Sequence, residues 1–338
     1  MDRRNIQVGD YMAVTSKLPN LVSSTTAIYN NTNCSEIMKT RNPKVEIFLI
    51  TLLTCVFIFG TIFNSLAVWV FCFKMKKWTE TRVFMMNLLF SDCCLLFTLP
   101  FRIYTTQHPW PLGDSWCNAL LSVYFMNTYV SIAVITLISM DRYVAIKFPI
   151  KARTLRSPRK AALACGIIWL VYITIRLYLG LDTDRRLSKS CFRKETEKPL
   201  NRALYFTVFG TCLPMVILIF CSTQIILTLK KKMSVNKKKK IKKSISIVKT
   251  NLAIFLFCFL PFSTGNIVRF VIESIGSDCS LIKFINDIFY AAQGLSDINC
   301  CLDSICYYFV AKEFWENISL IPKLKIQLIK GQMPESSL

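Results

Sequence analysis

The chain has 338 residues, of which 53% are hydrophobic and 13% aromatic, and its mean hydropathy is +0.42. A water-soluble domain needs a more polar surface, so this composition excludes an ordinary soluble globular protein. The formal net charge of +22 suits an anionic partner. Because the basic residues lie beside apolar segments, this partner is expected to be the anionic lipid of a membrane surface, and no nucleic acid is expected.

Seven apolar segments of membrane-spanning length follow one another along the chain. Each is close to the roughly 20 residues that a helix needs to cross a bilayer. They occupy residues 47–73, 83–104, 117–140, 161–181, 203–229, 250–272 and 284–310. We therefore predict an all-α membrane protein, a seven-transmembrane helix bundle with no internal repeat and no additional soluble domain.

The remaining segments are short. We predict an extracellular N-terminal tail over residues 1–45, the seven-transmembrane domain over 46–309, a short amphipathic eighth helix over 310–321 and a cytoplasmic tail over 322–338. Val310, Phe314 and Ile318 recur every four residues in the predicted eighth helix. This spacing is typical of an amphipathic helix that lies on a membrane surface.

Lysines and arginines are distributed unevenly between the loops. The loops after the first, third and fifth spans hold 3, 6 and 10 of them, more in total than the loops after the second, fourth and sixth. The positive-inside rule then predicts an extracellular N-terminus and a cytoplasmic C-terminus at the plasma membrane. Asn30 and Asn33 begin N-glycosylation sequons in the tail that is predicted to be outside, which agrees with this orientation.

Four of the fifteen cysteines lie on the predicted outer side: Cys34, Cys117, Cys191 and Cys279. In an oxidising compartment they suggest two disulfide bonds. The sequence alone leaves all three pairings of four cysteines open. Most of the other cysteines are expected to be small apolar residues inside the spans.

Polar side chains recur near the predicted middle of the membrane. Asn64, Asp92, Ser131, Asn299 and Asp303 come from four different spans. Each alone is explained as a buried, hydrogen-bonded residue. Two carboxylates that lie close together do not both ionise cheaply without a cation or a shared proton. Together these residues supply enough oxygen atoms for a small hard cation inside the bundle.

Asp141, Arg142 and Tyr143 end the third span on the predicted inner side. An acid and a base in this position often only anchor a helix at the membrane interface. The residues that follow, Ile146 to Ile150, present an apolar knob on the same side, which weakens the explanation by a simple interface anchor. Prolines inside the fifth and sixth spans kink these helices, which suits a moving part.

Three arginines lie near the outer ends of different spans: Arg102, Arg176 and Arg269. For each alone, a charged group that reaches the lipid head groups is about as good an explanation. Together they favour an anionic small ligand that comes from outside, because guanidinium pairs with carboxylate or phosphate through two hydrogen bonds. Tyr124, Tyr129 and Phe259 are candidate aromatic walls. We expect Asp297 either to pair with one of these arginines or to line the pocket floor.

The order of these motifs resembles that of the rhodopsin-like (class A) G-protein-coupled receptors. The resemblance runs from Asn64 to the short helix after Tyr308. It rests on Asn64, Asp92 in NLLFSD, Trp110, Cys117, Asp141-Arg142-Tyr143, Trp169, Pro214, Phe255, Cys258, Phe259, Pro261, Asp303 and Tyr307. Any one motif is weak, but their order across seven spans is highly specific. Phe259 and Asp303 are similar to the branch of nucleotide and lipid receptors, and the stretches NSLAVWVFCFKMKKWTETR, LRSPRKAA, SCFRK and CCLDSICYYFVAKEF narrow the resemblance to one group of that branch.

The resemblance implies roles for the cysteines and for the polar residues of the spans. It implies a Cys117–Cys191 disulfide bond and a Cys34–Cys279 disulfide bond. It also implies a pocket in which a sodium ion acts as an allosteric modulator, formed by Asp92, Ser131, Asn299 and Asp303. No other metal and no cofactor are expected.

For signalling, the resemblance implies a receptor that moves no substrate and is not an enzyme. The implied coupling residues are Asp141, Arg142, Tyr143, Ile150 and Tyr307. The implied partners are a heterotrimeric G protein of the inhibitory or 12/13 class, arrestin, membrane lipids and a small anionic ligand, either an aromatic carboxylate or lysophospholipid-like.

Six residues are the candidate ligand contacts: Arg102, Tyr124, Thr128, Arg176, Phe259 and Arg269. Thr128 stands where the group has a ligand-binding arginine, and we expect Arg102 to replace part of that charge. A transporter or channel would also explain acids in the membrane, but it predicts repeats or broken helices. A membrane enzyme would need a nucleophile–base pair or a metal site, and the sequence shows neither. A non-signalling scavenger receptor stays an alternative, although it would not need Arg142.

Overall fold

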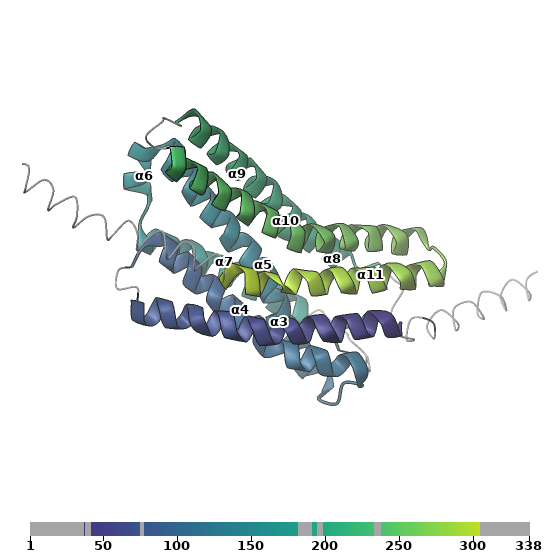
Figure 1. The fold of residues 1–338 in the computed structure, drawn as a ribbon. Helices are drawn as coiled ribbons and strands as arrows, with labels where there is room; N and C mark the ends of the chain where they lie inside the picture. The colour runs from purple at the N-terminus through teal and green to yellow at the C-terminus, as the bar shows by residue number, and fades with distance from the viewer. Residues whose placement is uncertain are drawn as a thin grey trace, which may run out of the picture.

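The computed structural model describes residues 42–74, 78–181, 191–194, 199–232 and 238–304, together with Ile37. Every regular element in these ranges is a helix (Figure 1). In chain order they are α3 (Pro43–Trp69), η1 (Val70–Lys74), α4 (Glu80–Gln107), α5 (Gly113–Lys147), α6 (Pro149–Leu155), α7 (Pro158–Leu181), α8 (Asn201–Thr207), η2 (Val208–Cys212), α9 (Leu213–Lys231), α10 (Lys238–Ile275) and α11 (Cys279–Asp297).

The predicted spans correspond to long helices. In the part of the chain that the structure describes, six helices are long and apolar enough to cross a membrane: Pro43–Phe73, Glu80–Gln107, Gly113–Lys147, Pro158–Tyr178, Asn201–Lys231 and Ser244–Ile275. The seventh predicted span coincides with α11 and with residues 299–304, which are helical again after a turn at Ile298. This last helix carries the charged residues Lys283, Asp287 and Asp297.

Local signals in the sequence explain where helices begin. Asn42 caps α3 and accepts a hydrogen bond from the backbone N–H of Lys44 at 3.1 Å, while Pro43 occupies the first turn, where no N–H is needed. Thr79 caps α4 and accepts from the backbone N–H of Arg82 at 3.3 Å. These caps satisfy backbone donors that a helix leaves unpaired at its start.

The fifth span contains a π-helical turn, η2, between α8 and α9. In this turn the backbone N–H of Leu213 donates to the carbonyl oxygen of Val208, five residues earlier. Pro214 follows directly and has no N–H to donate, so the wider turn gives its ring space. A Cβ atom on Gly210 would lie 2.8 Å from Cδ1 of Tyr129, so only glycine lets the ring of α5 approach so closely.

The helices form one closed bundle. α3 packs against α4 and α11, α11 against α10, α10 against α9, and α9 against α5, which also contacts α4 and α7. Figure 1 shows α11 lying between α3 and α10, so the last span closes the ring on the first. Polar residues from α3, α4, α5 and α11 can therefore meet inside the bundle.

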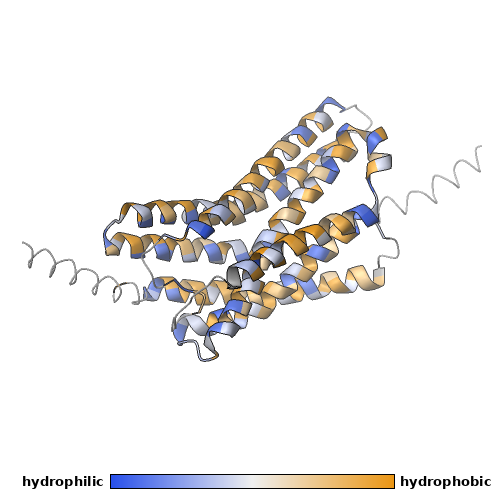
Figure 2. Ribbon diagram, turned by 180° about the vertical axis from the view of Figure 1, so that it is seen from behind, coloured by the Kyte–Doolittle hydropathy of each residue, from blue (hydrophilic) through white to orange (hydrophobic). Residues whose placement is uncertain are grey.

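The outer faces of the helices are apolar. Figure 2 shows hydrophobic residues along most of the length of the long helices. Large exposed hydrophobic side chains include Ile58, Phe59, Ile62 and Leu66 of α3 and Leu163, Ile167 and Leu170 of α7. Apolar surface on this scale is expected to contact lipid. The first span begins earlier than predicted, because α3 starts at Pro43 inside the predicted N-terminal tail of residues 1–45. The rest of that tail apart from Ile37 and Asn42, the predicted eighth helix and the predicted cytoplasmic tail lie outside the described residues, as do Asn30, Asn33, Cys34 and Tyr307.

Candidate functional site

Cys117 at the start of α5 forms a disulfide bond with Cys191, with the two Cα atoms 5.6 Å apart. This confirms the pairing that the resemblance implies. Cys279 is disulfide-bonded as well. Its predicted partner, Cys34, is outside the described part of the chain, so that pairing stays a prediction. We call the end of the bundle with Cys117 and Cys191 the disulfide end, and the opposite end the Arg142 end.

The segment 191–194 crosses the disulfide end and is called the strap. Its residue Phe192 has a φ angle of 64°, in the left-handed region, and its ring meets the ring of Tyr124 edge-on with centroids 5.7 Å apart. The backbone N–H of Lys194 donates to the hydroxyl of Tyr290 at 2.7 Å. The strap is thus held to α5 and to α11.

A second set of contacts joins the strap to α10. The ammonium group of Lys194 donates to Glu273 at 2.5 Å, and Nε of Arg269 donates to the other oxygen of the same carboxylate at 3.0 Å. Burial and the nearby charge of Arg269 lower the pKa of Lys194 to about 8, although Glu273 opposes the shift. Arg269, a predicted ligand contact, is therefore already paired with a carboxylate, and its guanidinium lies 4.9 Å from the ring of Phe289.

Arg102 lies at the centre of a buried polar cluster. It forms an ion pair with Asp297 and donates to the hydroxyl of Tyr124 at 2.5 Å and to the side-chain carbonyl of Gln293 at 3.3 Å. The hydroxyl of Tyr124 in turn donates to Asp297 at 2.9 Å. This confirms that Asp297 pairs with one of the three arginines. The cluster joins α4, α5 and α11, and the positive charge of Arg102 is compensated from within.

Arg176 on α7 has different surroundings. Its side chain is half-buried and donates from Nε and Nη2 to the hydroxyl of Ser122 on α5, at 3.2 and 2.8 Å. Among the described residues no carboxylate lies within ion-pairing distance of it. Tyr172, one turn earlier on α7, bonds the backbone carbonyl of Ser122 at 2.7 Å. The ring of Tyr172 lies 6.3 Å from that of Tyr129, which lies 5.2 Å from the ring of Phe206. Of the three predicted arginines, this one lies beside aromatic rings and has no carboxylate partner among the described residues.

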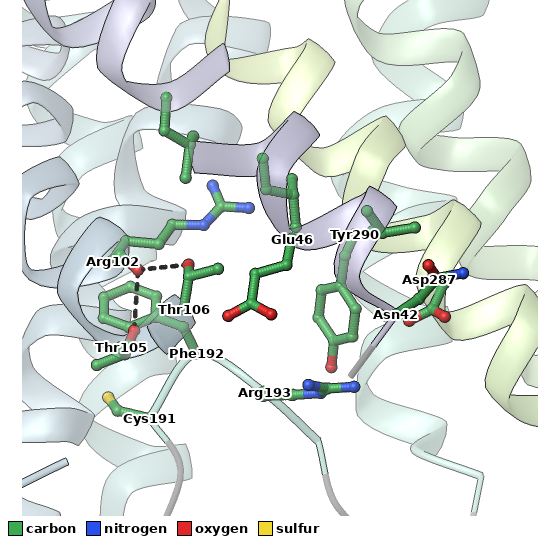
Figure 3. Close-up of a pocket in the computed structure, with 13 residues that line it drawn as sticks. Asn42, Glu46, Arg102, Thr105, Thr106, Cys191, Phe192, Arg193, Asp287 and Tyr290 are labelled. Atoms are coloured by element: carbon green, nitrogen blue, oxygen red, sulfur yellow. Dashed lines mark hydrogen bonds between the residues drawn. The ribbon is translucent and has the colours of Figure 1, made fainter. Parts of the chain in front are cut away.

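A cleft opens at the disulfide end between α3, α4, α11 and the strap (Figure 3). Arg102 and Arg193 line it together with Glu46, Asp287 and Tyr290. In Figure 3 the carboxylate of Glu46 points into the opening. The cleft therefore presents charges of both signs, unlike the surroundings of Arg176.

Two predicted ligand contacts lie deeper in the bundle. Thr128 is 4% exposed. Phe259 is fully buried and packs against Phe255 with ring centroids 4.9 Å apart, in a core cluster with Ile132 and Met215. The structure thus separates the predicted contacts into the Arg102–Tyr124 cluster, the Arg269 ion pair, the Arg176 region and this core.

The predicted sodium pocket is a buried polar site between α4, α5 and the end of the seventh span. Asn127 donates to Asp92 at 3.0 Å and lies 3.5 Å from the hydroxyl of Ser131. Asn299 donates to Asp303 at 2.6 Å. The second carboxylate oxygen of Asp92 and the carbonyl oxygen of Asn299 have no hydrogen-bond partner in the described part of the chain. Unpartnered buried oxygens of this kind fit a hard cation such as sodium.

At the Arg142 end, Asp141 does not pair with its neighbour. It accepts two hydrogen bonds from Arg156, at 2.8 and 2.9 Å, and Arg156 also reaches Glu80 at 3.7 Å. Arg142 donates to the hydroxyl of Thr81 at 2.9 Å. The two residues are thus oriented toward different partners, and α5 is held to α4 at this end.

The predicted apolar knob lies on a short helix. Ile150 in α6 is 84% exposed, while Ala152 of the same helix is buried. Tyr143 packs edge-on against Phe148 and Phe220, each with centroids 6.0 Å apart. An exposed isoleucine thus stands beside a fixed aromatic cluster.

The comparisons with known proteins agree with this geometry. Residues 63–307 match the model of the family described as 7 transmembrane receptor (rhodopsin family). The chain is a rhodopsin-family G-protein-coupled receptor. It is 37% identical to human G-protein coupled receptor 35 over 297 residues, which cover 86% of this chain and 92% of that protein. It is 32% identical to human G-protein coupled receptor 55 over 87% of this chain and 92% of that protein. It is 30% identical to human lysophosphatidic acid receptor 4, over 82% of this chain and 79% of that protein.

These relatives agree with the narrower resemblance of the four quoted stretches, which is to receptor 35 with receptor 55 as the near alternative. As a member of this family, the chain is a multi-pass membrane receptor and not an enzyme.

Three residues that take part in these contacts were not predicted from the sequence. Glu273 follows Arg269 by four residues, and this spacing could have identified the pair. Asn127 likewise precedes Ser131 by four residues. Arg156 pairs with Asp141 across a loop, and no local pattern signals such a contact.

Proposed function

We propose that this receptor lies in the plasma membrane with its disulfide end outside, binds a small anionic ligand there and activates heterotrimeric G proteins of the inhibitory or 12/13 class at the Arg142 end. The ligand is an aromatic carboxylate or a lysophospholipid-like molecule. The guanidinium group of Arg176 is the main contact of the ligand's anionic group.

The surroundings of Arg176 carry this proposal. Its guanidinium bonds only a neutral hydroxyl, Ser122, in the described residues. A carboxylate or phosphate gains more from a cation that has no competing internal partner. The rings of Tyr129, Tyr172 and Phe206 offer the apolar contact that an aromatic or acyl group needs.

The Arg142 end supports coupling. Arg142 donates a hydrogen bond to Thr81 of α4. Breaking this bond on activation would let the Arg142 side chain turn toward a G protein. Ile150 projects on the same side, next to the rings around Tyr143. We propose Asp141, Arg142, Tyr143, Ile150 and Tyr307 as the coupling residues; arrestin would use the same end.

A sodium ion would be held by Asp92, Ser131, Asn299 and Asp303, with Asn127 as a further neighbour. It would neutralise two carboxylates that repel each other. The ion would favour the resting arrangement. Asp92 of α4 and the seventh-span residues Asn299 and Asp303 would bind it from both sides and so hold the two helices together.

G-protein activation in cells tests the proposal. The wild-type chain is compared with Arg142→Ala and Arg176→Gln against a panel of aromatic carboxylates and lysophospholipids. Arg176→Gln removes a charged hydrogen bond of about 1.5–3 kcal/mol, so the potency of an anionic agonist is expected to fall about 10- to 100-fold. Arg193→Gln is the matched control, since it removes the same charge from the cleft at the same end.

Two outcomes would contradict parts of the proposal. Equal potency at Arg176→Gln and wild type would exclude Arg176 as the anion contact. A ligand that binds without a response sensitive to Arg142 would favour a non-signalling scavenger receptor. A lysophospholipid receptor is the second candidate function because the relatives include a lysophosphatidic acid receptor.

A further inference from the structure

The ion pair between Arg102 and Asp297 connects helices that are far apart in the sequence. Arg102 is 5% exposed and Asp297 and Tyr124 are 1% exposed, so the contact is shielded from water. The hydroxyl of Tyr124 bonds both charged partners. One cluster therefore fixes α4, α5 and α11 to one another.

The backbone of the seventh span is irregular directly after Asp297. α11 ends there, Ile298 forms a turn, and helix resumes at residue 299. The N–H of Ile298 donates to Leu295 at 3.2 Å, and the N–H of Cys301 donates to Ile298 at 3.0 Å. Both bonds span three residues instead of four, while the N–H of Leu302 still donates to Ile298 at 3.2 Å, so the helix tightens here into a 3₁₀ turn. A 3₁₀ turn in the middle of a helix often marks a hinge.

Each side of the hinge is anchored separately. On the far side, Asn64 of α3 donates to the carbonyl oxygen of Cys300 at 3.1 Å, and the thiol of Cys301 donates to the carbonyl oxygen of Val56 of α3 at 3.7 Å. On the near side, the side chain of Asp297 holds α11 to Arg102. Motion between the two halves of the span must therefore change the contact at Asp297 or the contacts with α3.

A contribution to the free energy of unfolding does not explain why a buried ion pair is present at this position. Removing two charges from water costs several kcal/mol per ion, and a well-packed apolar pair of similar volume is often equally stable. What the ion pair adds is geometry, because a bonded guanidinium fixes both position and direction.

We propose that the Arg102–Asp297 ion pair is a lock on the hinge at Ile298, which holds α11 in the resting arrangement until the receptor couples. Arg102 is then a positioning residue and not a ligand contact. This inference rests on the proposed G-protein coupling.

The test measures coupling without a ligand. The full-length receptor is reconstituted in nanodiscs, and nucleotide exchange on an inhibitory or a 12/13-class G protein is recorded. The double variant Arg102→Met/Asp297→Leu removes the lock without leaving an unpaired buried charge. We expect its basal exchange to exceed that of wild type about 3- to 10-fold, at equal receptor concentration.

A matched control is available in the same bundle. Trp169→Phe removes the hydrogen bond from Nε1 of Trp169 to Asn87 at 3.0 Å, which joins α7 to α4 but does not touch the seventh span. Its basal exchange is expected to equal that of wild type. If the first double variant does not fold, Asp297→Asn serves instead, since an amide oxygen still accepts from Tyr124 while the ion pair is lost.

Each result has one meaning. A rise in the lock variant alone supports the lock, and a similar rise in the Trp169→Phe control overturns it. Exchange equal to wild type also overturns it. Oleoyl lysophosphatidic acid and an aromatic carboxylate, added to wild type in the same assay, separate the two failures. If either ligand stimulates nucleotide exchange by wild type while basal exchange is unchanged in the lock variant, only the lock hypothesis is contradicted. If no version of the receptor stimulates exchange, the proposed G-protein coupling is contradicted as well.

Discussion

Replacing sodium by choline is predicted to destabilise the receptor through the buried site at Asp92. The site holds two carboxylates, Asp92 and Asp303, whose charges act on each other. One oxygen of Asp92 and one of Asn299 lack a hydrogen-bond partner within the described residues. A cation at this position would pair both oxygens and remove the repulsion, whereas choline is too large to enter.

The size of the effect follows from binding linkage. A ligand that binds only the folded state at ten times its dissociation constant stabilises that state by about 1.4 kcal/mol. For a protein of this size, about 1.4 kcal/mol corresponds to a change of about 2 °C in the unfolding temperature. We therefore expect the purified receptor to melt about 2 °C higher in sodium chloride than in choline chloride of equal ionic strength.

The assay is thermal unfolding of the purified receptor in detergent, followed by a thiol-reactive dye that detects exposed cysteines. Asp92→Asn removes one of the repelling charges and is expected to abolish the difference between the two salts. Asp287→Asn is the matched control, since it removes a carboxylate from the rim of the cleft and leaves the buried site intact. Equal melting of wild type in both salts, or a sodium effect that survives in Asp92→Asn, would refute the reasoning.

Three further predictions concern the strap, the π-helical turn and the Arg142 end. Because the pKa of Lys194 is lowered to about 8, its amine is expected to become reactive as the pH rises through about 8, below the usual value of 10.5; Glu273→Gln should move this midpoint lower, as competitive labelling and mass spectrometry can measure. Gly210→Ala should destabilise the receptor by about 1 kcal/mol through overpacking against Tyr129, and the same change should become stabilising in a Tyr129→Leu background, where only the helix propensity of alanine counts. Ile150→Ala should leave the melting temperature unchanged, because the side chain is exposed, yet lower agonist-stimulated nucleotide exchange; a parallel loss of both would contradict the assigned role.

The seven spans were readable because membrane helices need long apolar runs, and nothing else in a chain of this size produces seven of them. The Cys117–Cys191 bond came from the family resemblance, since four outer cysteines alone allow three pairings. The π-helical turn had a weaker signal, because Pro214 predicts an irregular helix without specifying its form.

The pairing of charges inside the bundle was harder to predict. Whether Arg102, Arg176 or Arg269 meets an acid depends on the rotation of each helix about its axis. A rotation of one residue, about 100°, moves a side chain from the interior to the lipid. Three arginines that look equivalent in the sequence therefore have different partners: Asp297, Glu273 and a neutral serine.

The short helix α6 has a consequence for the kinetics of partner capture. Arg156, directly after α6, donates a hydrogen bond to Asp141, and Ala152 of α6 is buried against the bundle. The backbone around Ile150 is therefore already ordered before a partner binds. Most of the conformational entropy that a disordered loop would lose on association is thus already lost in the free receptor. A partner that meets this side chain has only to exclude water from it, so association is expected to proceed by docking onto a preformed anchor, without a folding step.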